Sequence, residues 1–250
     1  MFEKIIEEVK AIDLEIVQEC TTNSRVKELY LGTQIFFGPF YEGIGNEPTI
    51  LFIGINPSSV EGDAKLWRDV DVRWEDENEK RHNYKEMSDG LQYIAYRSEL
   101  GNSVKKIFGE EKRYLLADSS SKINCYPFAT KGQKELENLL NSLPSNLRNK
   151  VVELSKEWLV EVIGTLKPLL IFYEGKYVFD FLKKTYLDKL ATDEQKMLEL
   201  KNNQVMQTTL NVGGGEDYID VLIAERNRSR FLNPELCKQK IDEWVKTYNL

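Results

Sequence analysis

The feature that most constrains the fold of this chain is the segment Thr49–Ser59, TILFIGINPSS. Its first part, Thr49–Ile53, is a short continuous apolar run followed by turn residues, which is typical of a buried parallel β-strand. Gly54 permits a close backbone approach at the end of this strand, and Pro57 prevents the strand from continuing. Asn56 lies between them, where open α/β sheets bind their ligands. The segment therefore predicts a strand that leads directly into a site.

Apolar strand-like runs alternate with helical stretches along the rest of the chain, and this alternation is typical of α/β proteins. The expected strands are Thr49–Ile53, Ser121–Tyr126, Pro168–Tyr173, and the pair Val205–Val212 and Tyr218–Ala224. The expected helices are Phe2–Cys20, Gly90–Phe108, Gln133–Leu143, Asn149–Leu166, a stretch from Gly175 to Tyr186, and Pro234–Tyr248. The last helix has Asn233 as its expected N-cap. We predict a three-layer α/β/α fold with a central, mostly parallel sheet of about four strands.

The segments that we expect to share this sheet are Thr49–Ile53, Lys122–Asn124, Leu169–Phe172 and Asp220–Ile223. No linker requires a second domain, so we predict a single domain over residues 1–250 with an N-terminal helix. The longest region without periodicity is Gly62–Asp89, which predicts a long loop at about residues 60–89. It contains Trp67 and the only histidine, His82.

The composition excludes several classes of protein. With 250 residues, 41% of them hydrophobic and 30% charged, the chain resembles ordinary soluble globular proteins. Its cysteines, Cys20, Cys125 and Cys237, are far apart, which predicts a reducing compartment and no metal site. The N-terminus does not resemble a secretory leader, and no apolar run approaches the ~18 residues of a membrane span. We therefore expect a cytoplasmic protein without a membrane partner.

Polar residues follow several of the expected strands, beside prolines or within charged segments. These segments are Asn56-Pro57, Asn124–Pro127 and Glu225–Arg230. Because the carboxyl ends of parallel strands share one edge of a sheet, the segments could converge on one crevice. An asparagine amide carries donors and an acceptor, which suits it to reading a base edge or holding a water. A single Asn before Pro is more often a turn residue, but several such strand ends together favour a site.

Arginines at 226, 228 and 230 surround Asn227 and Ser229 directly after an expected strand. One interpretation is a loop that contacts phosphates, because guanidinium groups bind phosphate in a fork. A solvated or ion-paired surface loop is an equally good interpretation in a chain with a net charge of −7. That net charge also argues against DNA as a partner unless basic residues are concentrated locally.

Other catalytic patterns are missing from the sequence. His82 lies in the charged run Glu79–His82, which favours a surface histidine and leaves a catalytic triad without its central member. No Gly-x-Gly-x-x-Gly follows a strand, and Gly213–Gly215 is not followed by Lys-Ser/Thr as in a phosphate-binding loop. A nucleotide-dependent kinase or dehydrogenase is therefore not expected.

Several of these motifs together resemble the uracil-DNA glycosylase superfamily. Gly54-Ile55-Asn56-Pro57 is similar to the first motif of its mismatch-specific branch, and Ile123-Asn124 to the strand whose asparagine reads the uracil edge. The segment from Trp158 to Lys176 resembles a helix–strand–glycine segment of the superfamily. Asn227-Arg228-Ser229 falls where these enzymes carry a His/Asn-Pro-Ser loop. Arg228 stands where that loop has proline, Ser58 replaces the glycine of the first motif, and no histidine is present in the loop.

The resemblance implies an enzyme that removes uracil or another damaged or mismatched base from single- or double-stranded DNA, without a cofactor or metal. Asn56 would position the attacking water, Asn124 would pair with the base together with Gly54 and Ile55, and Trp67 would stack on it. The residues expected on the DNA backbone are Arg226, Asn227, Arg228 and Ser229.

Two other interpretations stay open. The first is a non-catalytic member of the same fold that binds nucleic acid or a nucleotide-like ligand, which the missing loop histidine and the acidic net charge would suit. The second is a hydrolase of free nucleosides. A basic surface around Asn56 would favour nucleic acid, whereas an acidic rim would favour a small ligand.

Overall fold

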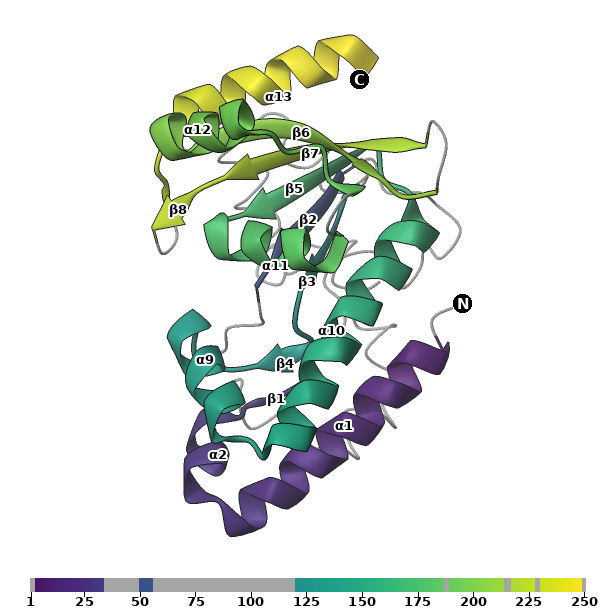
Figure 1. The fold of residues 1–250 in the computed structure, drawn as a ribbon, viewed down its shortest axis with the longest axis vertical. Helices are drawn as coiled ribbons and strands as arrows, with labels where there is room; N and C mark the ends of the chain where they lie inside the picture. Colours follow the sequence, from purple (N-terminus) through teal and green to yellow (C-terminus); the bar gives the residue numbers. More distant parts are fainter. Residues whose placement is uncertain are drawn as a thin grey trace, which may run out of the picture. The chain divides into compact units, whose positions relative to one another are not determined.

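The structure is a computed structural model that describes residues 3–33, 50–55, 120–186, 189–213, 217–227 and 230–248. These residues form a mixed α/β fold with a mostly parallel, five-stranded sheet (Figure 1). Their contacts divide the chain into two compact units. The first unit contains α1, α2, β1, β4, α9 and most of α10, and the second contains the five-stranded sheet and the C-terminal helices.

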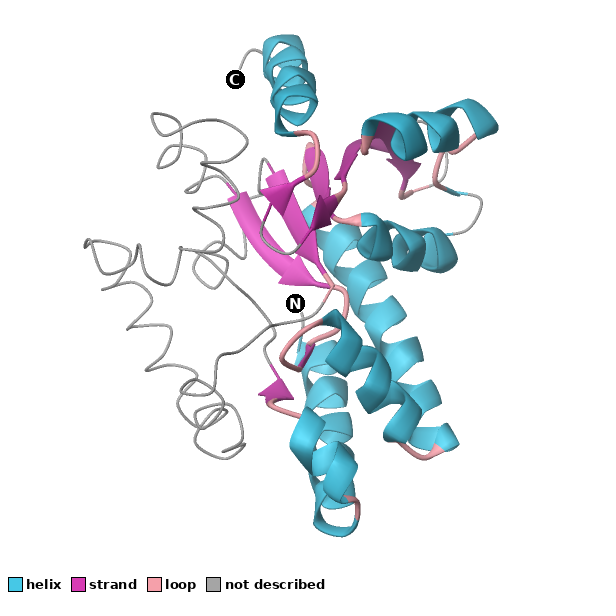
Figure 2. Cartoon of the chain, turned by 90° about the vertical axis from the view of Figure 1, so that its left-hand side faces the viewer, coloured by secondary structure: helices cyan, strands magenta, loops and turns pink. Residues whose placement is uncertain are grey.

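The sheet of the second unit has the strand order β3-β2-β5-β7-β6, with the strands labelled in Figure 1. Figure 2 shows the strands in magenta. Its strands are β2 (Ile50–Gly54), β3 (Ser120–Asn124), β5 (Leu170–Glu174), β6 (Val205–Asn211) and β7 (Tyr218–Ala224). Strands β2, β5 and β7 run parallel, and their register places Ile53, Tyr173 and Ile223 level with one another. These three strands therefore end at the same edge of the sheet. All the segments predicted to share a sheet do so.

The central strands β2 and β5 are almost entirely apolar, and all of their residues are buried. Such continuous apolar runs are typical of strands that are covered on both faces. The exception is Glu174, the last residue of β5. Phe52 and Phe172 lie on one face of the sheet, with ring centroids 5.4 Å apart. They belong to a core cluster with Leu222 and with Trp244 of the C-terminal helix.

Three helices of the second unit pack on this sheet or beside it. They are α11 (Lys176–Tyr186), α12 (Glu194–Asn203) and α13 (Pro234–Tyr248). Asn233 caps α13 as predicted, because its Oδ1 accepts from Leu236 N at 3.2 Å. Asp220 of β7 accepts from the Trp244 indole at 3.1 Å and from the Tyr248 hydroxyl at 2.9 Å. These hydrogen bonds fix α13 against the sheet.

The first unit is mainly helical. Its elements are α1 (Glu3–Thr22), α2 (Ser24–Leu29), β1 (Gly32–Thr33), β4 (Phe128–Ala129), α9 (Gln133–Ser142) and α10 (Ser145–Leu166). Strands β1 and β4 form an antiparallel pair. Asn23 connects the start of α2 with the end of α9. Its Oδ1 caps α2, and its Nδ2 donates to the carbonyl of Ser142, the last residue of α9, at 3.1 Å. An ion pair between Glu15 and Lys150 joins α1 to α10 at 2.8 Å.

Several predicted boundaries differ from those of the structure. Strand β3 ends at Asn124 and not at Tyr126, because the Tyr126 N–H donates outside the ladder to Ile55 O. Helix α10 begins near Pro144, whose carbonyl accepts the first helical hydrogen bond from Arg148 N. The sheet has five strands, whereas about four were expected. The additional strand is β6, which lies at the edge of the sheet. It pairs antiparallel with β7, and these two strands are the pair that the sequence predicted. Helix α12 was not predicted, since its apolar spacing is weak.

The predicted helix Gly90–Phe108 and the predicted loop at about residues 60–89 lie outside the described residues. In the ranges that the structure describes, none of the helices combines the length and the apolar character needed to cross a bilayer.

Candidate functional site

The first predicted site segment follows strand β2. Gly54 is the last, buried residue of this strand, and the half-buried Ile55 comes next. The Ile55 carbonyl accepts a hydrogen bond from the Tyr126 N–H at 2.9 Å. This bond ties the segment after β2 to the segment after β3. The structure thus joins Ile55 to the predicted segment Asn124–Pro127. The predicted segment Asn56-Pro57 itself lies outside the described residues.

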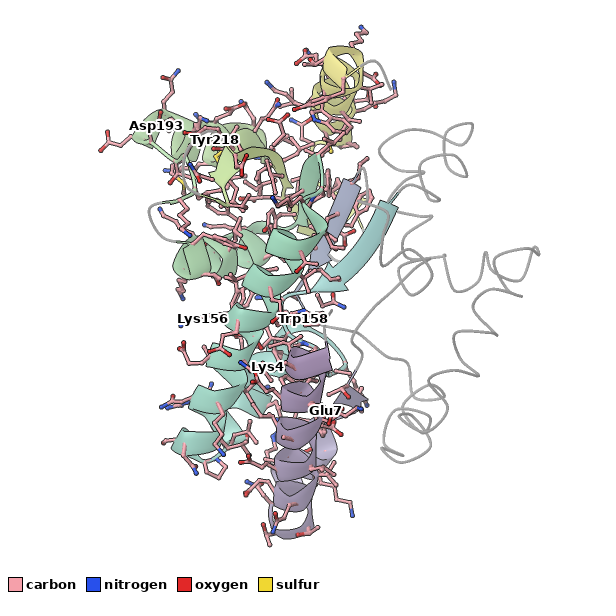
Figure 3. All side chains as sticks on the ribbon, turned by 90° about the vertical axis from the view of Figure 1, so that its right-hand side faces the viewer. Lys4, Glu7, Lys156, Trp158, Asp193 and Tyr218 are labelled. Carbon is pink, nitrogen blue, oxygen red and sulfur yellow. The ribbon has the colours of Figure 1, made fainter. Side chains whose placement is uncertain are left out.

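Asn124 is the last residue of β3 and only 5% exposed. Its carbonyl oxygen accepts a hydrogen bond of 3.0 Å from the indole Nε1 of Trp158 on α10. Trp158 is labelled in Figure 3. An asparagine side chain offers two N–H donors and one acceptor to a ligand. Asn124 therefore combines a tethered backbone carbonyl with a side chain suited to polar recognition.

The residues around Asn124 form a buried, apolar surround. All residues from 123 to 130 are buried. Burial raises the pKa of the Cys125 thiol well above its ordinary value, so that the side chain is a neutral thiol at physiological pH. Because the thiolate is the nucleophilic form of cysteine, Cys125 is not a nucleophile here. The polar side chains that remain in this segment are those of Asn124, Tyr126 and Thr130.

Glu174 is a residue at the strand ends that the sequence analysis missed. It is the last residue of β5, the middle strand of the sheet, and it is only 6% exposed. It lies level with Ala224 in the sheet register. Gly175 follows with φ of 114°, a left-handed conformation that favours glycine, and helix α11 starts at the next residue. The sequence could have indicated Glu174 as a candidate, because it is a polar residue directly after an apolar run, like Asn56 and Asn124.

The segment with the arginines is a short hairpin and not the extended loop that the sequence predicted. Its strands are β8 (Arg226–Asn227) and β9 (Arg230–Phe231), which pair antiparallel. The hairpin begins one residue after β7 and is anchored at Glu225, whose carbonyl accepts from Leu232 N at 2.9 Å. The ring of Phe231 packs edge-on against Phe172, with centroids 5.7 Å apart. The local pairing of residues 226 and 231 turns the chain back on itself, which sequence alternation alone did not indicate.

The structure describes some of the predicted site residues and not others. Gly54, Ile55 and Asn124 are described, and so is the backbone of the hairpin that carries Arg226 and Asn227. The other predicted residues lie outside the described ranges, namely Asn56, Trp67, Arg228 and Ser229. Asn124 belongs to the first compact unit and the hairpin to the second. The convergence of Asn56, Asn124 and Asn227 on one pocket stays a prediction.

Within the described ranges, no group of His, Cys, Asp and Glu side chains has the arrangement of a metal site. Comparison of the sequence with models of known protein families finds no match, and comparison with curated proteins also finds none. The resemblance to the uracil-DNA glycosylase superfamily is therefore a resemblance of motifs.

Proposed function

We propose that this protein is a DNA glycosylase-like enzyme that removes uracil or another damaged or mismatched base from DNA by hydrolysis of the N-glycosidic bond. The observation that carries the proposal is Asn124 itself, a polar residue that is only 5% exposed at the end of a strand and whose backbone carbonyl accepts a hydrogen bond from Trp158. The motif resemblance assigns this same residue to the reading of the base edge.

The chemistry of an amide suits base recognition. An asparagine side chain offers two N–H donors and a carbonyl acceptor, and a flipped nucleobase presents the complementary groups on its Watson–Crick edge. A base whose donors and acceptors match the Asn124 amide forms hydrogen bonds that a mismatched base cannot form. In the proposal, the base that pairs with Asn124 is thereby selected over bases with the wrong donor pattern.

The remaining roles follow the motifs. Asn56 positions the attacking water, because an amide is too weak a base to deprotonate it early. Trp67 stacks on the flipped base, beside Gly54 and Ile55. The DNA backbone is held by Arg226, Asn227, Arg228 and Ser229 in and around the hairpin. The reaction uses no resident metal or cofactor.

The finer features of the fold belong to the same proposal. We take the chain to be one uracil-DNA glycosylase-like domain with α/β/α layering. The layering is supported by the burial of both faces of β2 and β5 and by the packing of α13 on one face. The buried free thiols of Cys125 and Cys237 suit a reducing compartment such as the cytoplasm.

A specific feature of the chain favours a second function, which is non-catalytic binding of nucleic acid or a nucleotide. The only histidine is His82, far in sequence from Asn227-Arg228-Ser229, so that the loop lacks the group that would stabilise a departing base anion. The experiment below separates the two functions, because binding without base release supports the second.

The test is a single-turnover assay on labelled oligonucleotides that carry uracil, hypoxanthine, xanthine or mismatched thymine, as single and double strands. Abasic products are cleaved with alkali and separated by size, and binding is measured in parallel. Release from one of these substrates supports the proposal. No release at stoichiometric enzyme, together with absent or salt-insensitive DNA binding, rejects it.

Two variants assign the chemistry. Asn56→Ala should remove most product formation with binding largely intact, because the residue acts on the transition state. Asn124→Ala should lower both product formation and discrimination between bases, because it removes the base-edge contacts. The matched control is Asn202→Ala, which removes an exposed amide on α12 and should leave both properties unchanged.

A further inference from the structure

We infer that Trp158 is a positioning residue that holds the Asn124 amide in its base-reading orientation. This inference rests on the proposed function of Asn124. Trp158, labelled in Figure 3, lies inside helix α10 and far from the motif strands in sequence. Its indole N–H donates to the Asn124 carbonyl at 3.0 Å. The hydrogen bond joins residues 34 positions apart.

Burial makes this contact rigid. The Trp158 side chain is fully buried, as are Leu159 and Val162 on the same helix. A buried ring with this many neighbours cannot change rotamer without opening the core. The indole nitrogen is a donor only, so that it aims at a single acceptor, and here that acceptor is the carbonyl of Asn124.

A second backbone tether lies two residues further along the chain. Tyr126 N–H donates to Ile55 O at 2.9 Å, so the residues on both sides of Cys125 are pinned. A hydrogen bond to the carbonyl of Asn124 restrains the backbone from which its side chain projects. The place from which the amide can reach a base therefore depends on this tether. Pre-organisation of that kind is what a base-reading group requires.

The hydrogen bond from Trp158 would look the same if its role were only to join the helix to the strand. A second buried tryptophan provides a matched control that separates this structural role from a positioning role. Trp244 on α13 is also buried, and its Nε1 donates to Asp220 at 3.1 Å. Trp158→Phe and Trp244→Phe each remove one buried indole donor and keep an aromatic ring. Only the first variant removes a donor to Asn124.

The direct test is the side-chain amide of Asn124 in ¹⁵N NMR spectra of the full chain, assigned by its disappearance in Asn124→Ala. Trp158→Phe should shift or broaden this amide pair, and Trp244→Phe should leave it in place. An Asn124 amide that is unchanged in Trp158→Phe would overturn the inference. This readout does not depend on catalytic activity.

The kinetic test is a double-mutant cycle on the base-release reaction. Trp158→Phe should lower the single-turnover rate by about 10-fold to 100-fold, as expected when a reacting or recognising group is displaced by about 1 Å. In the Asn124→Ala background the same substitution should change the rate less than about 2-fold, because a residue that acts through Asn124 has nothing left to position. Independent, multiplied effects of the two substitutions would contradict the inference. If the wild-type protein releases no base, the proposed function fails, and the amide spectrum still decides the role of Trp158.

Discussion

At the scale of single residues, burial sets the chemical state of the thiols. Cys237 belongs to the core cluster under α13 and is 1% exposed. Its removal from water raises the pKa of the thiol from 9.0 to about 12, because the low-dielectric core disfavours the thiolate. In the unfolded chain the same thiol ionises from about pH 9 upward. Its contribution to stability is therefore fully present below pH 9 and is lost as the pH rises toward 12.

This linkage predicts a difference in pH dependence between the wild type and Cys237→Ala. At pH 10 the wild-type protein should lose about 1.4 kcal/mol of unfolding free energy through this thiol, relative to pH 7. The Cys237→Ala variant should be less stable at pH 7, because it leaves a small cavity, but its stability should decline less steeply between pH 8 and 10. Urea unfolding at several pH values under reducing conditions measures both slopes. Parallel slopes would count against a neutral buried thiol.

At the scale of elements, one asparagine defines where the C-terminal helix starts and what it is attached to. The Asn233 Oδ1 accepts from Leu236 N at 3.2 Å, and its Nδ2 donates to Asn203 O at the end of α12, at 3.0 Å. The first bond caps α13, and the second joins α12 to α13. Pro234 follows the cap at the first helical position, where its missing N–H carries no cost.

Two substitutions should separate these contributions. Asn233→Asp keeps the acceptor for Leu236 N and loses only the donor to Asn203 O. Asn233→Ala loses both bonds, so it should be the more destabilising change, with about 1 kcal/mol from the cap alone. The comparison of urea midpoints at neutral pH measures the difference. Equal midpoints for the two variants would show that the cap contributes nothing.

At the scale of the whole molecule, charge decides how this chain could bind DNA. The net charge is −7, so a DNA contact has to come from a local concentration of basic residues. The hairpin segment provides one, with arginines at 226, 228 and 230 directly after the edge of the sheet where β7 ends.

On the proposed function, Arg226→Ala and Arg228→Ala should each weaken DNA binding by a similar factor for all sequences. Each should also reduce the slope of log K against log salt by about 1 for a lost phosphate contact. Fluorescence anisotropy at a series of salt concentrations measures both effects. Lys246→Ala, which removes an exposed charge on α13, is the control and should preserve the slope. If the slope of Arg226→Ala equals that of the control, the hairpin does not contact phosphates.

Much of the fold of the second unit was determined by local sequence. The apolar run that contains Ile50–Gly54 becomes a buried strand because its residues have no polar face to present to water. The same reasoning located β5, the β6–β7 pair and the cap at Asn233. These features depend on hydrophobic pattern and turn chemistry, which are properties of short stretches of chain.

Tertiary structure alone decided the features on which the candidate site depends. The hydrogen bonds from Trp158 to Asn124 and from Tyr126 to Ile55 join residues that are distant in sequence, and no local pattern encodes such a pairing. The burial of Glu174 likewise follows from its place in the middle strand, where neighbouring strands exclude water from a carboxylate that sequence alone would expose. The sequence by itself determined which segments form the strands, to within one or two residues at their ends. Tertiary packing decided which of their residues are buried and which are tethered by hydrogen bonds, as Asn124 is by Trp158. The physical reason is that local propensities form a helix or strand, whereas long-range contacts set the position of the side chains that it carries.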